Sequence, residues 1–168
     1  ESIEAVDKIV GPGNIYVSLA KKQVFGTVGI DGIYGPSELA IIADESASAK
    51  QVAADLLSQL EHGSGLESTL FLTDSKKLLL ETKEELEKQI IAFESKTDEQ
   101  IATIRSSLEK WSALILTEDL AEAVDIVNQY APEHLELHTK DPNALVDEIK
   151  SAGAIFIGAN SCESLGDY

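Results

Sequence analysis

Short runs of apolar residues alternate along the chain with longer stretches in which apolar residues recur every three or four positions. The runs predict buried strands at residues 38–43, 68–73, 113–117, 135–138 and 154–157. The spaced patterns predict helices from Ser46 or Ser48 to Gly63, from Asp74 or Ser75 to about residue 93, and over residues 99–110, 120–130 and 142–152. This alternation indicates an α/β fold, a mostly parallel sheet flanked by helices in an incomplete Rossmann-like domain.

The start of the chain has a different pattern. Residues 1–25 are predicted to form an N-terminal extension or linker helix, with helical residues at 16–23, and residues 26–168 to form the α/β domain. Glycine and β-branched residues at 24–30 predict a short strand at the junction.

Composition excludes several classes of partner. Thirteen basic against thirty acidic residues give a net charge of −17, which disfavours nucleic acid and anionic membranes. No apolar run approaches the roughly 20 residues that cross a bilayer. The single cysteine, Cys162, cannot form an internal disulfide, and the first residues carry neither a basic start nor an apolar run. We therefore predict a cytoplasmic protein.

Polar clusters follow several of the predicted elements. Gln59 and His62 are three residues apart, so on one helix they share a face and can bind a metal, although a histidine at a helix end is commonly a surface residue. Glu133 and His134 lie at a helix-to-strand junction and offer two groups for separate proton transfers, or simply a turn. Asp167 follows the last strand and is expected near the carboxyl ends of the strands.

Two further turns carry polar residues ahead of regular elements. Ser37 lies in a Gly-Pro turn before a buried strand, where it can present its hydroxyl or backbone amide to a ligand. Asn14 closes Gly-Pro-Gly-Asn and can either cap a helix or contact a cofactor. The turn lacks the spacing of a dinucleotide-binding glycine motif.

Taken together, the clusters resemble the central part of the histidinol dehydrogenase family, a group of enzymes that use NAD and zinc to oxidise an amino alcohol twice. The matching sequence motifs, which occur in the same order as in the family, are GPGN at 11–14, GPSE at 35–38, SQLEH at 58–62, APEH at 131–134 and LGDY at 165–168. We expect the chain to lack an upstream region and the C-terminal tail of the family, which contributes a further histidine ligand from a second subunit.

The resemblance implies a role for each cluster. Zinc would be bound by Gln59, His62 and Asp167, and these three residues with Ser37 and His134 would contact the substrate, histidinol. Glu133 and His134 would be catalytic, Asn14 would contact NAD, and the protein would be a homodimer. The chain alone is expected to show little or no turnover. The alternative is a non-catalytic α/β binding or assembly module with a degraded metal site.

Overall fold

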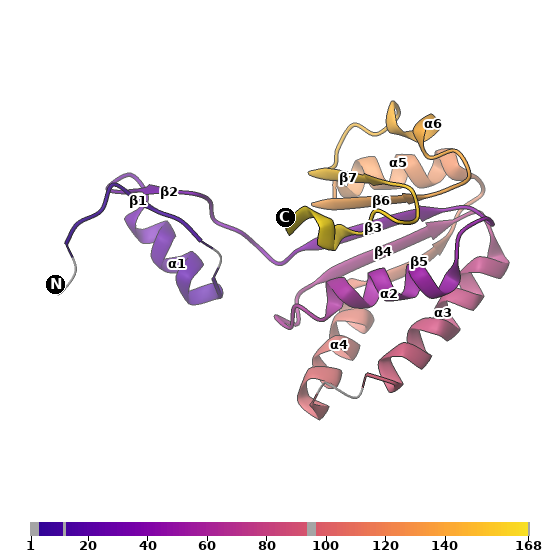
Figure 1. The fold of residues 1–168 in the computed structure, drawn as a ribbon, viewed down its shortest axis with the longest axis horizontal. Helices are drawn as coiled ribbons and strands as arrows, with labels where there is room; N and C mark the ends of the chain where they lie inside the picture. Colours follow the sequence, from indigo (N-terminus) through magenta and orange to yellow (C-terminus); the bar gives the residue numbers. More distant parts are fainter. Residues whose placement is uncertain (1–3, 12, 94–96, 168) are drawn as a thin grey trace. The chain divides into compact units, whose positions relative to one another are not determined.

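The computed structural model describes residues 4–11, 13–93 and 97–167, which divide into two compact units, residues 1–35 and 36–168. Figure 1 shows the elements of both units in sequence colours. The division falls after Gly35, ten residues beyond the end of the extension expected from sequence.

The first unit is a small βαβ arrangement. Strands β1 (Lys8–Ile9) and β2 (Gly29–Ile30) pair in parallel, and helix α1 (Ile15–Val24) connects them. The side chain of Asn14 accepts hydrogen bonds from the N–H groups of Tyr16 and Val17, at 3.1 and 3.3 Å, and so caps α1. The predicted strand at 24–30 is shorter than expected, because the chain turns at Gly26, whose φ of +91° favours glycine.

The second unit is built on a five-stranded, entirely parallel sheet, which confirms the predicted fold class. The strand order is β5-β4-β3-β6-β7, the order of five of the six strands of a Rossmann sheet. The strands are β3 (Glu38–Ala43), β4 (Ser68–Thr73), β5 (Ala113–Leu116), β6 (His134–His138) and β7 (Ala154–Ile157).

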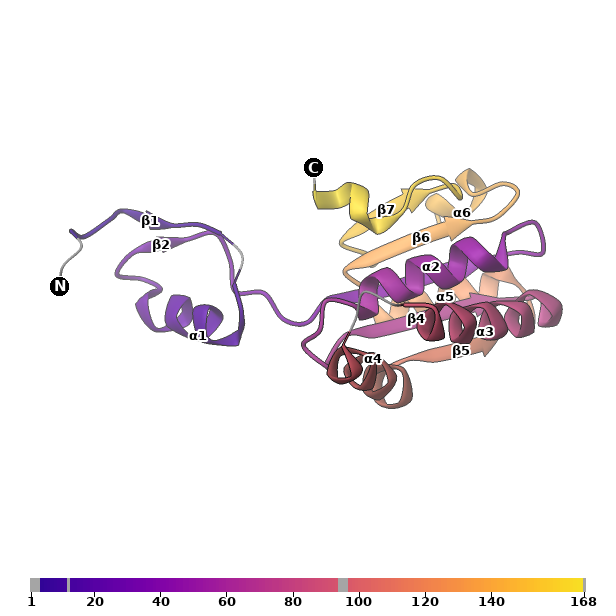
Figure 2. The ribbon, with the colours of Figure 1, turned by 60° about the horizontal axis from the view of Figure 1, so that its bottom comes forward.

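Helices cover both faces of this sheet (Figures 1 and 2). Helices α2 (Ala49–Leu60), α3 (Lys76–Ile91) and α4 (Asp98–Trp111) pack on one face, around Leu39, Ile41 and Phe71. Helices α5 (Leu120–Tyr130) and α6 (Asn143–Val146) pack on the other, around Ile42 and Leu72. The central strands read as unbroken apolar runs because both of their faces are buried.

One predicted helix is mostly absent. Residues 142–152 were expected to be helical, but α6 ends at Val146 after a single turn. Asn128 of α5 explains the difference, because its side chain donates to the carbonyl of Glu148 and accepts from the N–H of Lys150. These bonds take backbone groups that a continued helix would have paired internally.

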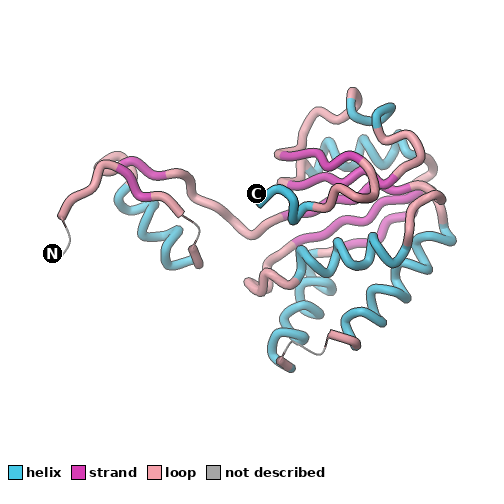
Figure 3. Tube along the Cα trace, viewed as in Figure 1, coloured by secondary structure: helices cyan, strands magenta, loops and turns pink. Residues whose placement is uncertain are grey.

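After β7 the chain reverses along the sheet. Figure 3 shows the loop that leaves β7 and leads back to the short 3-10 helix η1 (Glu163–Asp167), near the ends at which β3 and β6 begin. The N–H of Glu163 donates to the side chain of Glu136, which fixes η1 against β6. The C-terminal segment therefore lies at the amino edge of the sheet, the edge where its strands start.

Candidate functional site

Most of the predicted site residues of the second unit gather at the amino edge of the sheet. Ser37 precedes β3, and His134 is the first residue of the neighbouring strand β6, paired with Leu39. Helix α2 runs back from the carboxyl end of β3 to the start of β4, so it brings Gln59 and His62 to the same edge (Figure 1). Segments distant in sequence thus meet there.

His134 is held on one side and accessible on the other. Its imidazole is 24% exposed, while its Nδ1 is buried 3.5 Å from the Oε2 atom of Glu163. The ring of Phe156 meets it edge-on, with 5.7 Å between the ring centroids. Because Nδ1 faces inward, the accessible part of the imidazole lies on the side away from that atom, where a substrate can approach.

The backbone before His134 is clamped to the neighbouring strand. The N–H groups of Gly153 and Ala154 donate to the carbonyls of Pro132 and Glu133, at 3.0 and 2.9 Å. A Cβ atom at position 153 would lie 2.6 Å from the carbonyl oxygen of Glu133, so this close approach requires glycine. The side chain of Glu133 is exposed, which leaves its carboxylate free to meet a ligand at this edge.

Gln59 and His62 have opposite environments. Gln59 is fully buried, and neither its amide oxygen nor its amide nitrogen has a hydrogen-bond partner in the described residues. The expectation of one helix for both residues is wrong, because α2 ends at Leu60 and His62 lies exposed in the turn that Gly63 closes with a φ of +82°. His62 lines a hollow of about 300 Å³ shared with the start of α4.

Asp167 ends η1, and its side chain lies outside the described part of the structure. The expectation that the carboxyl ends of the strands position it is wrong for its backbone. The chain reversal after β7 takes η1 to the amino edge, and the contact of Glu163 with His134 fixes it there.

The other two predicted residues have backbone roles. Ser37 is half-buried, and its carbonyl accepts from the N–H of Ser68, which ties the start of β3 to β4. Asn14 belongs to the first unit, where it caps α1. The turn before Asn14 is held by Lys21, which is buried and bonds both the carbonyl of Gly11 and, at 2.7 Å, the carboxylate of Asp31.

Sequence reasoning missed a buried polar cluster farther along β6. His138 Nε2 lies 3.0 Å from Oε2 of the fully buried Glu136 and 3.8 Å from Oδ2 of Asp55. Burial, with the charge of Glu136, raises the pKa of Asp55 to about 7, and His138 opposes the rise. The alternation of polar and apolar residues from His134 to His138 was the available signal, because a period of two places every second side chain on one face.

This cluster also has the donors of a metal site. Ligand atoms of Asp55, Glu136 and His138 all lie within 4.8 Å of one another. The pairing of His138 with Glu136 and the raised pKa of Asp55 let the cluster balance its charge through a proton.

The residues predicted for zinc fit that metal in donor chemistry. An amide oxygen, an imidazole and a carboxylate are donors that borderline metals accept, and glutamine is an uncommon one. The unpartnered amide of Gln59 supports the fit, because a buried amide without a hydrogen bond costs stability unless a ligand satisfies it.

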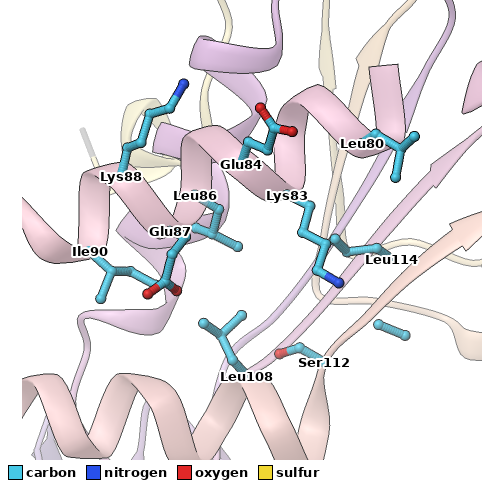
Figure 4. A pocket seen from close by; sticks show the side chains of 11 residues that line it. Leu80, Lys83, Glu84, Leu86, Glu87, Lys88, Ile90, Leu108, Ser112 and Leu114 are labelled. Carbon is cyan, nitrogen blue, oxygen red and sulfur yellow. The ribbon is translucent and has the colours of Figure 1, made fainter. Parts of the chain in front are cut away.

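Two other hollows lie apart from these residues. The larger, about 800 Å³, opens between α3, α4 and β5 and is walled by Leu86, Leu108 and Leu114 (Figure 4). A hollow of about 480 Å³ lies at the carboxyl edge, where Rossmann sheets bind nucleotides, and includes Asp44, Glu45 and Asp74 with a single cation, Lys140. This acidic lining disfavours a phosphate group. No helix in the described residues is long and apolar enough to span a membrane.

Comparisons with known proteins agree on one family. The family model described as histidinol dehydrogenase matches residues 1–168. A histidinol dehydrogenase from Aquifex aeolicus is 52% identical over the whole chain, which spans 38% of that relative's length. The crystal structure of histidinol dehydrogenase from Elizabethkingia anophelis superposes with a TM-score of 0.83 at 42% identity, covering all of this chain and 37% of that one.

A more distant structure shares the fold alone. The gamma-glutamyl phosphate reductase from Thermotoga maritima gives a TM-score of 0.56 at 15% identity, over 92% of this chain and 42% of that one.

Proposed function

Because the chain belongs to the histidinol dehydrogenase family, we propose that it supplies part of an NAD- and zinc-dependent site that oxidises L-histidinol to L-histidine through the aldehyde. The observation that carries the proposal is the placement of His134, with Nδ1 buried against Glu163 and the rest of the ring accessible at the amino edge. Such a ring can accept a proton from a substrate on its open side.

Gln59, His62 and Asp167 are the residues that would hold zinc, and Asn14 would contact NAD. Bound zinc would supply a Lewis acid for the amino and imidazole groups of the substrate, and bound NAD would supply the hydride acceptor for the two oxidations. The hydroxyl of Ser37 contacts the substrate at the start of β3. The second subunit of a homodimer completes the site in this proposal.

The residues of this chain supply the proton transfers. In the first oxidation His134 accepts the proton of the substrate hydroxyl while the carbon loses a hydride. Glu133, on the exposed segment before β6, then accepts a proton from the water that adds to the aldehyde carbon, while His134 returns its proton to the aldehyde oxygen, which gives the hydrate. His134 accepts the hydroxyl proton of the hydrate as the second hydride leaves, which gives the carboxylate.

A chimera provides the direct test of this function. Residues 1–168 replace the matching segment of the Aquifex aeolicus relative, which supplies the flanking regions that the match leaves uncovered. We expect sustained NADH formation from histidinol, and a loss of about 100-fold or more in kcat on His134→Gln. A folded chimera without activity beside an active parent, or one that His134→Gln leaves unaffected, would refute the proposal.

Zinc binding separates this proposal from the non-catalytic alternative. Calorimetric titration of the chimera should show tight binding that His62→Ala weakens. His134→Gln, which removes an imidazole outside the proposed ligand set, should leave the affinity unchanged. A degraded metal site predicts no binding in any of the three proteins.

A further inference from the structure

A row of polar side chains runs along β6 on the sheet face that α2 covers. His134, Glu136 and His138 occupy alternate positions of the strand and so share this face. Leu135 and Leu137, between them, pack on the opposite face with α5. The outer member of the row, His134, is the only one of the three that is accessible to solvent.

Glu163 of η1 joins the row from a segment 29 residues later in the chain. Its side chain is 5% exposed, and its Oε2 atom lies 3.5 Å from Nδ1 of His134. Its backbone N–H donates to Oε1 of Glu136 at 2.8 Å, and the other oxygen of Glu136 lies 3.0 Å from Nε2 of His138. The backbone of Glu163 is thus fixed from one side while its carboxylate faces the imidazole on the other.

We propose that Glu163 is the positioning residue of His134: its carboxylate holds the proton on Nδ1 and leaves the lone pair of Nε2 free toward the accessible side. The idea rests on the proposed function only in taking His134 as the base. An unconstrained neutral imidazole favours the proton on Nε2, where it cannot accept a substrate proton from that direction. The carboxylate reverses this preference by accepting a hydrogen bond from the Nδ1–H group, as carboxylates beside catalytic histidines do.

The burial of Glu163 supports this role. A buried carboxylate costs free energy unless it is paired, and the side chain of Glu163 is buried with its Oε2 atom facing the imidazole of His134. The separation of 3.5 Å exceeds that of a direct hydrogen bond. Such contacts are often long in unliganded sites and shorten when substrate binds.

The tautomer of His134 tests the proposal without metal, cofactor or substrate. The chain has three histidines, so nitrogen-15 spectra of the imidazole rings can be assigned through His62→Gln and His138→Gln. At a pH where the rings are neutral, we expect the proton of His134 on Nδ1. Glu163→Ala should move it to Nε2, and Glu163→Gln should keep most of it on Nδ1, because the amide oxygen still accepts a hydrogen bond.

A matched control removes the same charge elsewhere. Glu109→Gln changes an exposed carboxylate on α4 and should leave the His134 spectrum unchanged. A wild-type chain with the proton on Nε2, or a Glu163→Ala variant that keeps it on Nδ1 with an unchanged His138 spectrum, would overturn the proposal. The unchanged His138 spectrum establishes that the variant is folded.

The chimera adds a kinetic readout that separates the two proposals. Glu163→Ala should lower kcat about 10-fold or more with little change in KM, and Glu163→Gln should restore part of the loss. A chimera that is inactive throughout contradicts the proposed function and leaves the tautomer result standing. An active chimera in which Glu163→Ala has full kcat contradicts the positioning role alone.

Discussion

Replacing Asp55 by asparagine should change how the stability of the chain depends on pH. Asp55 lies on α2 beside Glu136 and His138, and burial with the charge of Glu136 raises its pKa to about 7. In the unfolded chain the same carboxyl titrates near its ordinary value of about 4. Between these two values the folded state binds a proton that the unfolded state has released, so the free energy of unfolding falls as the pH rises. Above the folded pKa the loss is complete.

The size of this change in the free energy of unfolding depends on the pH range over which it can be measured. Because the isoelectric point is 4.4, measurements begin at pH 5.5, where the protein keeps a large net negative charge. From there to the folded pKa is about 1.5 pH units, and each unit corresponds to about 1.4 kcal/mol, which gives about 2 kcal/mol. The side chain of Asp55 is 17% exposed. Screening by water reduces the value, and we expect about 1–2 kcal/mol.

Urea unfolding followed by circular dichroism gives the free energy of unfolding at pH 5.5, 6.2, 7.0 and 8.5 for the wild type and for Asp55→Asn. Asparagine keeps the shape of the side chain and cannot ionise, so the variant should gain about 1–2 kcal/mol on the wild type between pH 5.5 and 7 and then stay level. The three histidines are present in both proteins, so the difference between the two curves reports on Asp55 and its surroundings. Asp125→Asn, at an exposed position of α5, should follow the wild type. Parallel curves for wild type and Asp55→Asn would refute the reasoning.

Three further changes test other parts of the structure. Gln59→Met should raise the free energy of unfolding by about 1 kcal/mol, measured in urea, because it removes a buried amide without hydrogen-bond partners; a clear loss would show that the amide is satisfied. Lys21→Met should lower hydrogen-exchange protection in residues 4–35 and leave residues 36–168 unchanged, and the exposed Lys22→Met serves as the control. The reason is that Lys21 holds the pKa of Asp31 well below its usual range, and the stabilisation from this pair is present above about pH 4. Ala131→Gly should raise the thermal midpoint, with a gain of about 0.5–1 kcal/mol, because Ala131 has a left-handed φ of 56°; an unchanged or lower midpoint would contradict this.

The sheet was predictable from the sequence because its strands are buried on both faces. Runs such as residues 38–43 and 68–73 are apolar throughout, and burial on two sides is the physical cause of that pattern. The helix expected at 142–152 forms only one turn, α6. Its amphipathic spacing was real, but Asn128, from another helix, takes the backbone groups of residues 148 and 150. A hydrogen bond between two elements that are distant in sequence produces no periodic pattern from which it could be predicted.

The sequence singled out candidate residues for the site, but it did not indicate the edge of the sheet at which they lie. The sequence motif around Glu133 and His134 was part of the family resemblance. Open parallel sheets usually bind ligands at the carboxyl ends of their strands, and this indicated the carboxyl edge. The chain reversal between β7 and η1 moves the C-terminal segment to the opposite edge, and a loop gives no pattern from which such a reversal can be inferred. Glu163 was missed for the same reason, because its contact with His134 exists only after that reversal.

The row along β6 has an arrangement of charge that suits a base. A histidine that accepts a proton becomes a cation, and in a partly buried position that cation needs a fixed negative group beside it. Glu163 is such a group, and its backbone is held by Glu136, which in turn lies against His138. With Asp55 holding a proton up to a pH of about 7, the row presents two carboxylates to two imidazoles. Each group of the row therefore lies against the next, and this is the arrangement that the proposed positioning of His134 by Glu163 requires.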